Sequence, residues 1–150
     1  MENSQNLKKA LFLTPTDTTI GFVSQDSTKI DKAKKRLPNK HYIKVVNSLK
    51  TLKSFSRVPQ KYKNMVRRAK KTTFIMPNGN SFRVVRESKH NLLLDRLKWA
   101  YSSSANLSGK EYNPDYAKEV AEIIISEPNI KNSTPSKIYR LGRDRLRVVR

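Results

Sequence analysis

Short apolar runs alternate with polar segments along most of the chain, and their spacing predicts both strands and helices. Runs rich in β-branched and aromatic residues predict strands at 9–13, 42–46, 72–76, 81–85, 99–103, 137–141 and 146–149. Apolar residues at helical spacing predict helices at 28–35, 48–55, 59–69, 91–98 and from 114 to near Pro128. Strands interleaved with helices predict a single α/β domain over residues 1–150, a twisted open mixed sheet flanked by helices.

Turn and capping residues support several of these boundaries. Asn78-Gly79 between the runs 72–76 and 81–85 predicts a hairpin. Asn47 or Ser48 can cap the helix that begins near residue 48, and Asn113 followed by a proline is typical of a helix start. The segment 15–21, rich in threonine, is predicted to be a polar loop.

The composition excludes several kinds of site. The 150 residues contain no cysteine, which excludes disulfides, thiolate nucleophiles and cysteine-ligated metals. The two histidines, His41 and His90, are too few and too far apart for a histidine metal site, so no metal-ligating residue is predicted. No apolar run is long enough to span a bilayer or to act as a signal peptide. We therefore expect a cytoplasmic protein with no membrane partner.

The charge of the chain is high and unevenly placed. The formal net charge is +20, and residues 29–71 contain sixteen Lys or Arg against one acid, Asp31. Such a field attracts polyanions, among which nucleic acid is the commonest partner, although a solvated basic surface is the plainer alternative. The polar face of the helix predicted at 59–69 and the residues after it supply a candidate RNA-binding surface: Lys61, Lys63, Arg67, Arg68, Lys70 and Lys71.

Three polar loops at strand ends, 15–21, 34–40 and 102–109, are the candidate sites for chemistry. The first and third offer hydroxyls and close backbone approach, and the second offers closely spaced cations that could grip a polyphosphate. The sequence excludes a P-loop and a G-x-G-x-x-G motif, it has no acid cluster for a two-metal nuclease, and no Ser-His-acid arrangement can be read from its two isolated histidines.

Taken in order, these loops resemble the YrdC/TsaC family of threonylcarbamoyl-AMP synthases. The resemblance spans about residues 11–150, and its most specific string is Ser-Ala-Asn-Leu-Ser-Gly at 104–109. The other matching segments are Pro15-Thr16-Asp17-Thr18 with Gly21, Lys34-x-Arg36 with Lys40, Phe82-Arg83-Val84, Pro135-Ser136 and Val149-Arg150.

The resemblance implies a YrdC-like fold and a nucleotidyltransferase. The reaction it implies converts L-threonine, bicarbonate and ATP into threonylcarbamoyl-AMP and pyrophosphate, with magnesium accompanying ATP. A transferase partner then passes the threonylcarbamoyl group to tRNA. Threonine would be bound by Thr18, Arg83 and Ser136. ATP would be bound by Lys34, Arg36, Lys40, Ser104, Asn106 and Arg150. No covalent nucleophile is implied.

Departures from the family pattern keep a second function open. Ile20 replaces an aromatic residue, Val23 replaces a glycine, Leu37 replaces a proline, and Lys137 replaces a threonine. The alternative is a YrdC-like protein that binds double-stranded RNA or tRNA without synthase activity. A ribosome-associated structural protein is a third and weaker alternative, because it has no reason to keep these motifs in order.

Overall fold

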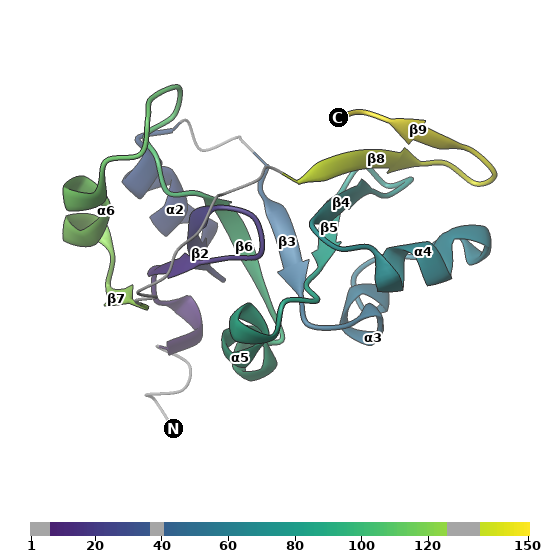
Figure 1. The fold of residues 1–150 in the computed structure, drawn as a ribbon, viewed down its shortest axis with the longest axis horizontal. Helices are drawn as coiled ribbons and strands as arrows, with labels where there is room; N and C mark the ends of the chain where they lie inside the picture. The colour runs from purple at the N-terminus through teal and green to yellow at the C-terminus, as the bar shows by residue number, and fades with distance from the viewer. Residues whose placement is uncertain (1–6, 37–40, 126–135) are drawn as a thin grey trace.

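Figure 1 shows a computed structural model of the chain, in which residues 7–36, 41–125 and 136–150 are described. The predicted architecture is confirmed: the strands of these residues form one twisted mixed sheet with helices on both faces. The strands are β1 (Phe12–Pro15), β2 (Ile20–Ser24), β3 (Ile43–Val46), β4 (Thr72–Ile75), β5 (Ser81–Val84), β6 (Trp99–Ser104), β7 (Ile123–Ile124), β8 (Lys137–Leu141) and β9 (Leu146–Val148). The helices are α2 (Ser27–Lys34), α3 (Leu49–Lys53), the 3-10 helix η1 (Gln60–Tyr62), α4 (Lys63–Arg68), α5 (Ser88–Leu97) and α6 (Pro114–Val120).

The sheet mixes parallel and antiparallel pairs in the order β7-β1-β2-β6-β3-β5-β4-β8-β9. β3 and β5 are parallel in the middle of the sheet, while β6 runs antiparallel to both β2 and β3. The β8–β9 hairpin ends the sheet on one side and lies above α4, as Figure 1 shows at the upper right. This topology places segments that are distant in the sequence side by side at the strand ends.

Three apolar clusters hold the helices against the sheet. Alternation along β3 illustrates the arrangement, because Val45 packs in the cluster of α5 whereas Val46 packs in the cluster of α3 and α4. A third cluster joins α2 and α6 to β1 and β2, and it includes the fully buried Phe22 and Ile30. Burial of such side chains is the main stabilising contribution to this fold.

Several boundaries predicted from local chemistry are confirmed. The side chains of Ser48 and Asn113 accept hydrogen bonds from the backbone N–H groups of Thr51 and Tyr116, capping α3 and α6. β4 and β5 form the expected antiparallel pair, and Gly79 in the connecting turn has a φ of 88°. A positive φ of this size favours glycine, which explains the residue at this position.

The helix predicted from residue 114 to near Pro128 is wrong beyond Val120. Ile123 and Ile124 form β7, a strand parallel to β1, and the N–H groups of Glu122 and Ile123 donate to the carbonyl of Leu11. The free edge of β1 therefore forms hydrogen bonds with backbone groups that a longer helix would have used within itself. Residues 126–135 lie outside the described residues.

Three other expectations need correction. The strand predicted at 9–13 begins only at Phe12, because residues 7–9 are helical. The segment 15–21 is not all loop, since β2 begins at Ile20 and pairs with β1 and β6. The single helix predicted at 59–69 is η1 followed by α4. No helix within the described residues is long and apolar enough to cross a membrane.

Candidate functional site

A cavity of about 410 Å³ opens where the β1–β2 turn meets the end of β6 and the start of β3. Its lining includes six of the nine residues that the sequence predicts to bind threonine or ATP: Thr18, Arg36, Arg83, Ser104, Ser136 and Arg150. The other lining residues are Thr16, Thr19, Gly21, His41, Tyr42, Ile43, Ser102 and Ser103. The fold thus brings residues of all three predicted polar loops together around one cavity.

Hydrogen bonds within the β1–β2 turn fix the first wall of the cavity. Thr16 Oγ1 donates to the carbonyl of Thr19 and also accepts from the N–H of Thr18 at 3.2 Å. Gly21 follows this turn, and a Cβ at this position would lie 2.9 Å from the carbonyl oxygen of Ser103. The close approach of β2 to β6 therefore requires glycine at this position.

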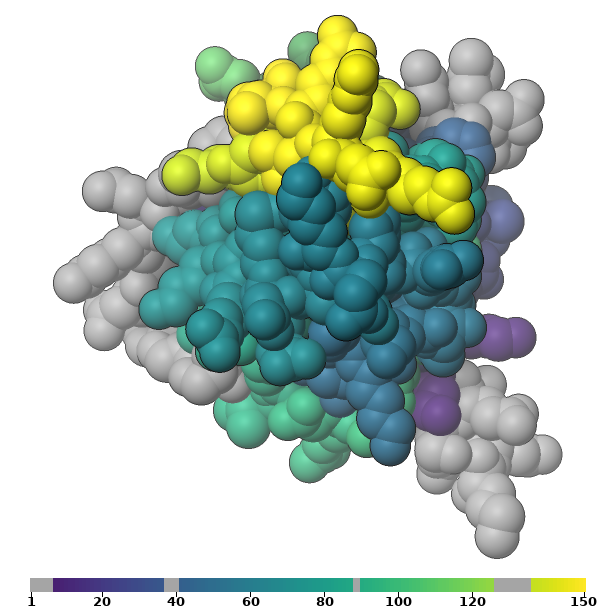
Figure 2. Space-filling model, turned by 90° about the vertical axis from the view of Figure 1, so that its right-hand side faces the viewer, coloured from purple at the N-terminus to yellow at the C-terminus, as the bar shows by residue number. Residues whose placement is uncertain are grey.

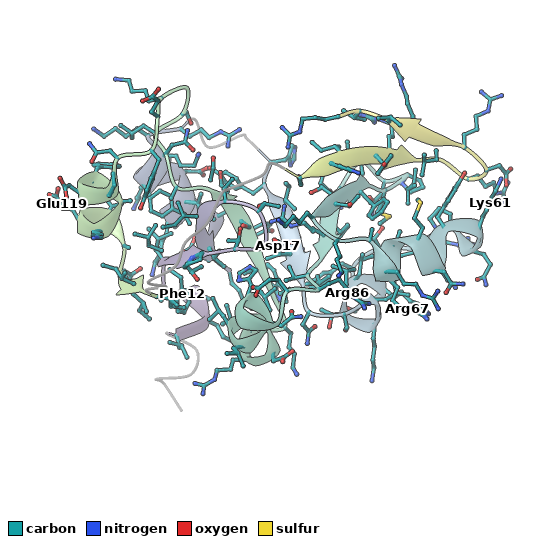
Figure 3. The ribbon with its side chains drawn as sticks, viewed as in Figure 1. Phe12, Asp17, Lys61, Arg67, Arg86 and Glu119 are labelled. Atoms are coloured by element: carbon teal, nitrogen blue, oxygen red, sulfur yellow. The ribbon has the colours of Figure 1, made fainter. Side chains whose placement is uncertain are left out.

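Arg83 is held in the cavity by a buried ion pair. Its Nη2 lies 3.3 Å from Oδ1 of Asp17, and both side chains are almost completely buried. Burial raises the pKa of Asp17, and the Arg83 charge partly opposes this rise. Burial also lowers the pKa of Arg83. Figure 3 labels Asp17 in the middle of the molecule. Asp17 lies within the Pro-Thr-Asp-Thr motif, but the motif alone did not predict its pairing with Arg83.

His90 lies behind this pair and carries no charge at neutral pH. Burial, together with the neighbouring Arg83 charge, lowers the pKa of His90 to about 4. Both imidazole nitrogens are buried without a hydrogen-bond partner among the described residues. A neutral ring adds no second positive charge beside Arg83. The two histidines were considered only as metal ligands in the sequence, so this role was missed.

Because the buried His90 is uncharged, we expect the free energy of unfolding to fall in acid. The unfolded chain binds a proton at this residue near pH 6.5, whereas the folded protein does so only near pH 4. The free energy of unfolding should therefore fall by roughly 3 kcal/mol from this residue as the pH drops through that window. Urea unfolding at several pH values measures the free energy of unfolding, and His90→Leu should make its dependence on pH weaker. The same substitution at exposed His41 is the control, and an equal slope in wild type and His90→Leu would contradict the assignment.

Lys34 lies behind the cavity wall instead of lining it. Its buried ammonium donates to the carbonyls of Ser104 and Asn106 at 2.8 and 2.9 Å. Burial lowers the pKa of Lys34 to about 8, and the neighbouring Arg36 charge contributes. These contacts tie the end of α2 to the loop after β6. Contact between Lys34 and ATP phosphates stays a prediction, and the hydrogen bonds in the structure give Lys34 a loop-positioning role.

Asn106 also organises this loop from outside the cavity lining. Its Oδ1 accepts from the hydroxyl of Ser104, and its Nδ2 donates to the carbonyls of Leu107 and Lys110 at 3.0 and 2.7 Å. The loop therefore presents Ser104 to the cavity in a fixed position. Lys40, the remaining predicted ATP contact, lies outside the described residues.

Arg36 lines the cavity, and its guanidinium group packs against the ring of Tyr42. Its guanidinium carbon lies 5.1 Å from the ring centroid, within the range of a cation–π contact. The Tyr42 hydroxyl donates to Asp31, and burial together with this bond raises the pKa of Tyr42 to about 12. None of the ion pairs between described residues involves Arg36. Its charge is therefore available to an anionic ligand.

Ser136 and Arg150 line the cavity together and contact each other. Arg150 Nε donates to the carbonyl of Ser136 at 3.1 Å, and the Ser136 hydroxyl accepts from Thr73 Oγ1 at the same distance. The cavity thus presents three guanidinium groups and several hydroxyls, and no Asp or Glu appears among the described residues that line it. This is the chemistry of a site for anions.

Comparison with known families identifies the chain. The Sua5/YciO/YrdC family model, described as "Telomere recombination", matches residues 7–150. The chain belongs to the Sua5/YciO/YrdC family. Among its relatives, uncharacterized protein MG259 of Mycoplasma genitalium is 28% identical over 163 residues, covering 97% of this chain and 35% of that protein. The Mycoplasma pneumoniae homolog is 30% identical over 150 residues, covering 91% and 31%. The chain spans about a third of the length of these curated relatives.

Solved structures share the Sua5/YciO/YrdC fold with this chain. P. abyssi Sua5 complexed with L-threonine has a TM-score of 0.80 at 18% identity, with 99% of this chain and 52% of that chain covered. E. coli YciO has a TM-score of 0.75 at 18% identity, covering 98% and 87%. MTH1692 from Methanobacterium thermoautotrophicum has a TM-score of 0.71 at 18% identity, covering 99% and 84%. Likeness at these identities establishes the fold.

Two departures from the family pattern are absorbed by packing in this Sua5/YciO/YrdC domain. Val23, which replaces a glycine, is fully buried in the cluster of β1, β3 and α5. Ile20, which replaces an aromatic residue, packs against the cluster of α2 and α6. Neither Ile20 nor Val23 lines the cavity. Leu37 lies outside the described residues.

Proposed function

We propose that the chain is an L-threonylcarbamoyladenylate synthase, which joins L-threonine, bicarbonate and ATP into threonylcarbamoyl-AMP and pyrophosphate. The observation that carries the proposal is the cavity itself, where Arg36, Arg83 and Arg150 converge with hydroxyls and without a carboxylate. Membership of the Sua5/YciO/YrdC family supports it, as does the likeness to a Sua5 complexed with L-threonine. All three substrates of this reaction carry an anionic group.

Threonine binds at the buried end of the cavity. The guanidinium of Arg83 pairs with the threonine carboxylate, and Asp17 keeps that guanidinium in place from behind. The hydroxyls of Thr18 and Ser136, which both line the cavity, contact the remainder of the amino acid. Because His90 is neutral, Arg83 and not the imidazole supplies the positive charge that the substrate carboxylate meets here.

ATP binds at the open end of the cavity. Arg36 and Arg150 contact its phosphates, and Ser104 contacts the nucleotide from the loop that Lys34 and Asn106 hold. Planar guanidinium groups suit phosphate oxygens because they can donate two parallel hydrogen bonds. The stacking of Arg36 on Tyr42 orients that group before the nucleotide arrives.

The chemistry needs positioning and charge stabilisation more than a nucleophilic side chain. The threonine amine adds to bicarbonate with loss of water, and an oxygen of the resulting carbamate attacks the α-phosphorus of ATP. The bond to the bridging oxygen breaks, and pyrophosphate leaves with the electron pair. Holding two anions in contact is unfavourable in water, so the arginines supply the binding energy and stabilise the developing charge.

Magnesium would enter with ATP and not at a protein site. The described residues contain no cluster of three Asp, Glu or His side chains, and the cavity lining presents no carboxylate. Magnesium prefers oxygen ligands and usually keeps several waters beside phosphate oxygens. The residues of this cavity therefore do not fit a resident magnesium ion, and the ATP phosphates would carry it.

In this proposal the product serves tRNA modification. Threonylcarbamoyl-AMP is a mixed anhydride, so a transferase partner must accept it and pass the threonylcarbamoyl group to tRNA. The chain spans about a third of the length of its curated relatives, so the interaction with a transferase is also part of what we propose.

Pyrophosphate release from ATP tests the proposal. The purified chain should release pyrophosphate only when threonine and bicarbonate are both present, and omission of either should return the rate to background. No release from protein that unfolds cooperatively would contradict the synthase and favour the alternative, an RNA-binding protein without this activity.

A further inference from the structure

The two parallel strands in the middle of the sheet, β3 and β5, end at a crevice. The chain that follows β3 forms α3 and α4, which pack in the cluster on one face of the sheet. The chain that follows β5 forms α5, which packs in the cluster on the other face. Figure 1 shows α3 and α5 on either side of the arrowhead of β3. Open α/β sheets bind ligands outside the carboxyl ends of strands at such points, where the connections diverge.

This crevice is separate from the cavity of the proposed synthase. Its volume is about 610 Å³, within the range of about 300–1,000 Å³ that is usual for small-molecule sites. Asn47 and Ser48 contribute to its lining directly after β3, and Arg86 does so shortly after β5. Among the described residues, none that lines the crevice also lines the synthase cavity. A ligand in the crevice therefore occupies a second site.

The described residues that line the crevice include four cations and no carboxylate. Lys50 and Lys53 lie on α3, Arg67 lies on α4, and Arg86 follows β5. Figure 2 faces the side of the molecule that carries α3 and α4, below the yellow β8–β9 hairpin. In the part of the chain that the structure describes, none of these four cations forms an ion pair. Because like charges that lie close together repel, this arrangement favours the binding of an anion.

Hydrogen bonds within the protein hold two polar side chains of the crevice in place. Arg86 Nη1 donates to the carbonyl of Arg67 at 3.0 Å, and Figure 3 labels both residues. The Arg86 guanidinium keeps further N–H groups that can donate to a ligand. Asn47 Oδ1 accepts from the hydroxyl of Thr51 at 2.7 Å, and Asn47 Nδ2 donates to Asp95, which lies outside the lining, at 3.4 Å. Side chains that are already positioned lose less conformational entropy when a ligand binds.

The number and origin of the cations indicate a ligand with more than one phosphate group. A single phosphate group presents three terminal oxygens. Two guanidinium and two ammonium groups from three segments supply more donors than these oxygens can accept with good geometry. A diphosphate or triphosphate chain is longer and carries more charge, so it can contact cations from all three segments.

We propose that the crevice binds a small ligand that carries a diphosphate or triphosphate group. Inorganic pyrophosphate and a nucleoside diphosphate share this chemistry and are its two candidate sources. The inference does not rest on the synthase function, because the two sites share no lining residue among those described. The crevice also differs from the candidate RNA-binding surface: of those six residues, Arg67 lines the crevice and the other five do not.

Nuclear magnetic resonance of the full ¹⁵N-labelled chain tests the proposal, because it reports on each site separately. Pyrophosphate and ADP are titrated in separate experiments. The backbone amide signals of Asn47, Ser48 and Arg86 should shift and reach saturation with the ligand that the crevice binds. Sulfate at the same ionic strength is the control for general anion binding and should give no saturable shift there. Tighter binding of ADP would identify a nucleotide as the source of the phosphates, and tighter binding of pyrophosphate would identify the inorganic ion.

Two matched variants separate the crevice from net charge. Lys53→Ala/Arg86→Ala should bind the ligand at the crevice at least about 10-fold more weakly, because two charge-assisted hydrogen bonds are lost. Arg68→Ala/Lys70→Ala removes the same charge from exposed residues outside the crevice. Its affinity should fall by less than about 3-fold, because only screened, long-range attraction is lost. Both variants should unfold at the wild-type temperature and keep the turnover of the proposed synthase.

Three results would overturn the proposal. Shifts at the crevice that do not saturate, or that sulfate reproduces, would indicate an adventitious ion only. Equal losses of affinity in the two variants would indicate an effect of net charge. Shifts confined to Thr18, Ser104 and the rest of the synthase cavity would reject the crevice as a site while they support the proposed function.

Discussion

Replacing Arg83 with methionine is expected to lower the free energy of unfolding by about 3–5 kcal/mol, because Asp17 then remains buried without its counter-charge. Asp17 can escape part of this cost only by taking up a proton. The loss relative to wild type at the same pH should therefore be smaller at pH 5 than at pH 8. Urea unfolding followed by the fluorescence of Trp99, the single tryptophan, measures both effects.

The double variant Asp17→Asn/Arg83→Met is the control for this prediction. Removing both charges leaves no unpaired ion in the interior, so the double variant should be more stable than Arg83→Met alone. A double variant as unstable as the single one would show that Arg83 contributes by packing and not by pairing with Asp17. If Arg83 also binds threonine, both variants should lose threonine-dependent turnover even where they remain folded.

Replacing Arg36 with alanine is expected to abolish most ATP-dependent turnover while the fold is kept. The guanidinium lines the cavity, is free of acidic partners among the described residues, and stacks on Tyr42. Loss of one preorganised charge at a developing phosphate charge costs about 10²- to 10³-fold in rate. Steady-state pyrophosphate release at varied ATP measures the loss in kcat/KM.

Two matched variants sharpen the Arg36 prediction. Arg36→Lys keeps the charge but loses the planar contact with Tyr42 and the paired donors, so it should fall between wild type and Arg36→Ala. Arg68→Ala removes an exposed arginine of α4 outside the cavity and should leave turnover unchanged. Full turnover by Arg36→Ala would remove this residue from the site.

Local sequence chemistry predicted the parts of the fold that depend on neighbouring residues. The caps at Ser48 and Asn113 and the hairpin around Gly79 involve contacts within a few residues, and all three are confirmed. The strand β7 could not be predicted in this way. Ile123 and Ile124 suit one face of a helix equally well, and only the free edge of β1 decides the outcome. β2 was missed because its first residues continue a polar, threonine-rich turn.

The candidate site was predicted through motif order, and its supporting residues were not. Arg83 and Ser136 are far apart in the sequence, so only the resemblance to the family predicted that they share a site. Both line the cavity in the structure. Asp17 and His90 gave no separate signal, because a buried ion pair and a buried neutral imidazole are set by tertiary burial. Lys44 shows the same limit: tertiary packing alone places its ammonium 4.0 Å from the ring centroid of Phe55 and 4.6 Å from that of Trp99.

Detection of the adenylate itself tests the central claim most directly. The chain is incubated with ATP, L-threonine and ¹³C-bicarbonate, and the products are analysed by mass spectrometry. We expect a threonylcarbamoyl-AMP product that carries the labelled carbon, that is absent when threonine is omitted, and that is strongly reduced with Arg36→Ala. A folded wild-type protein that yields no labelled adenylate would contradict the synthase function.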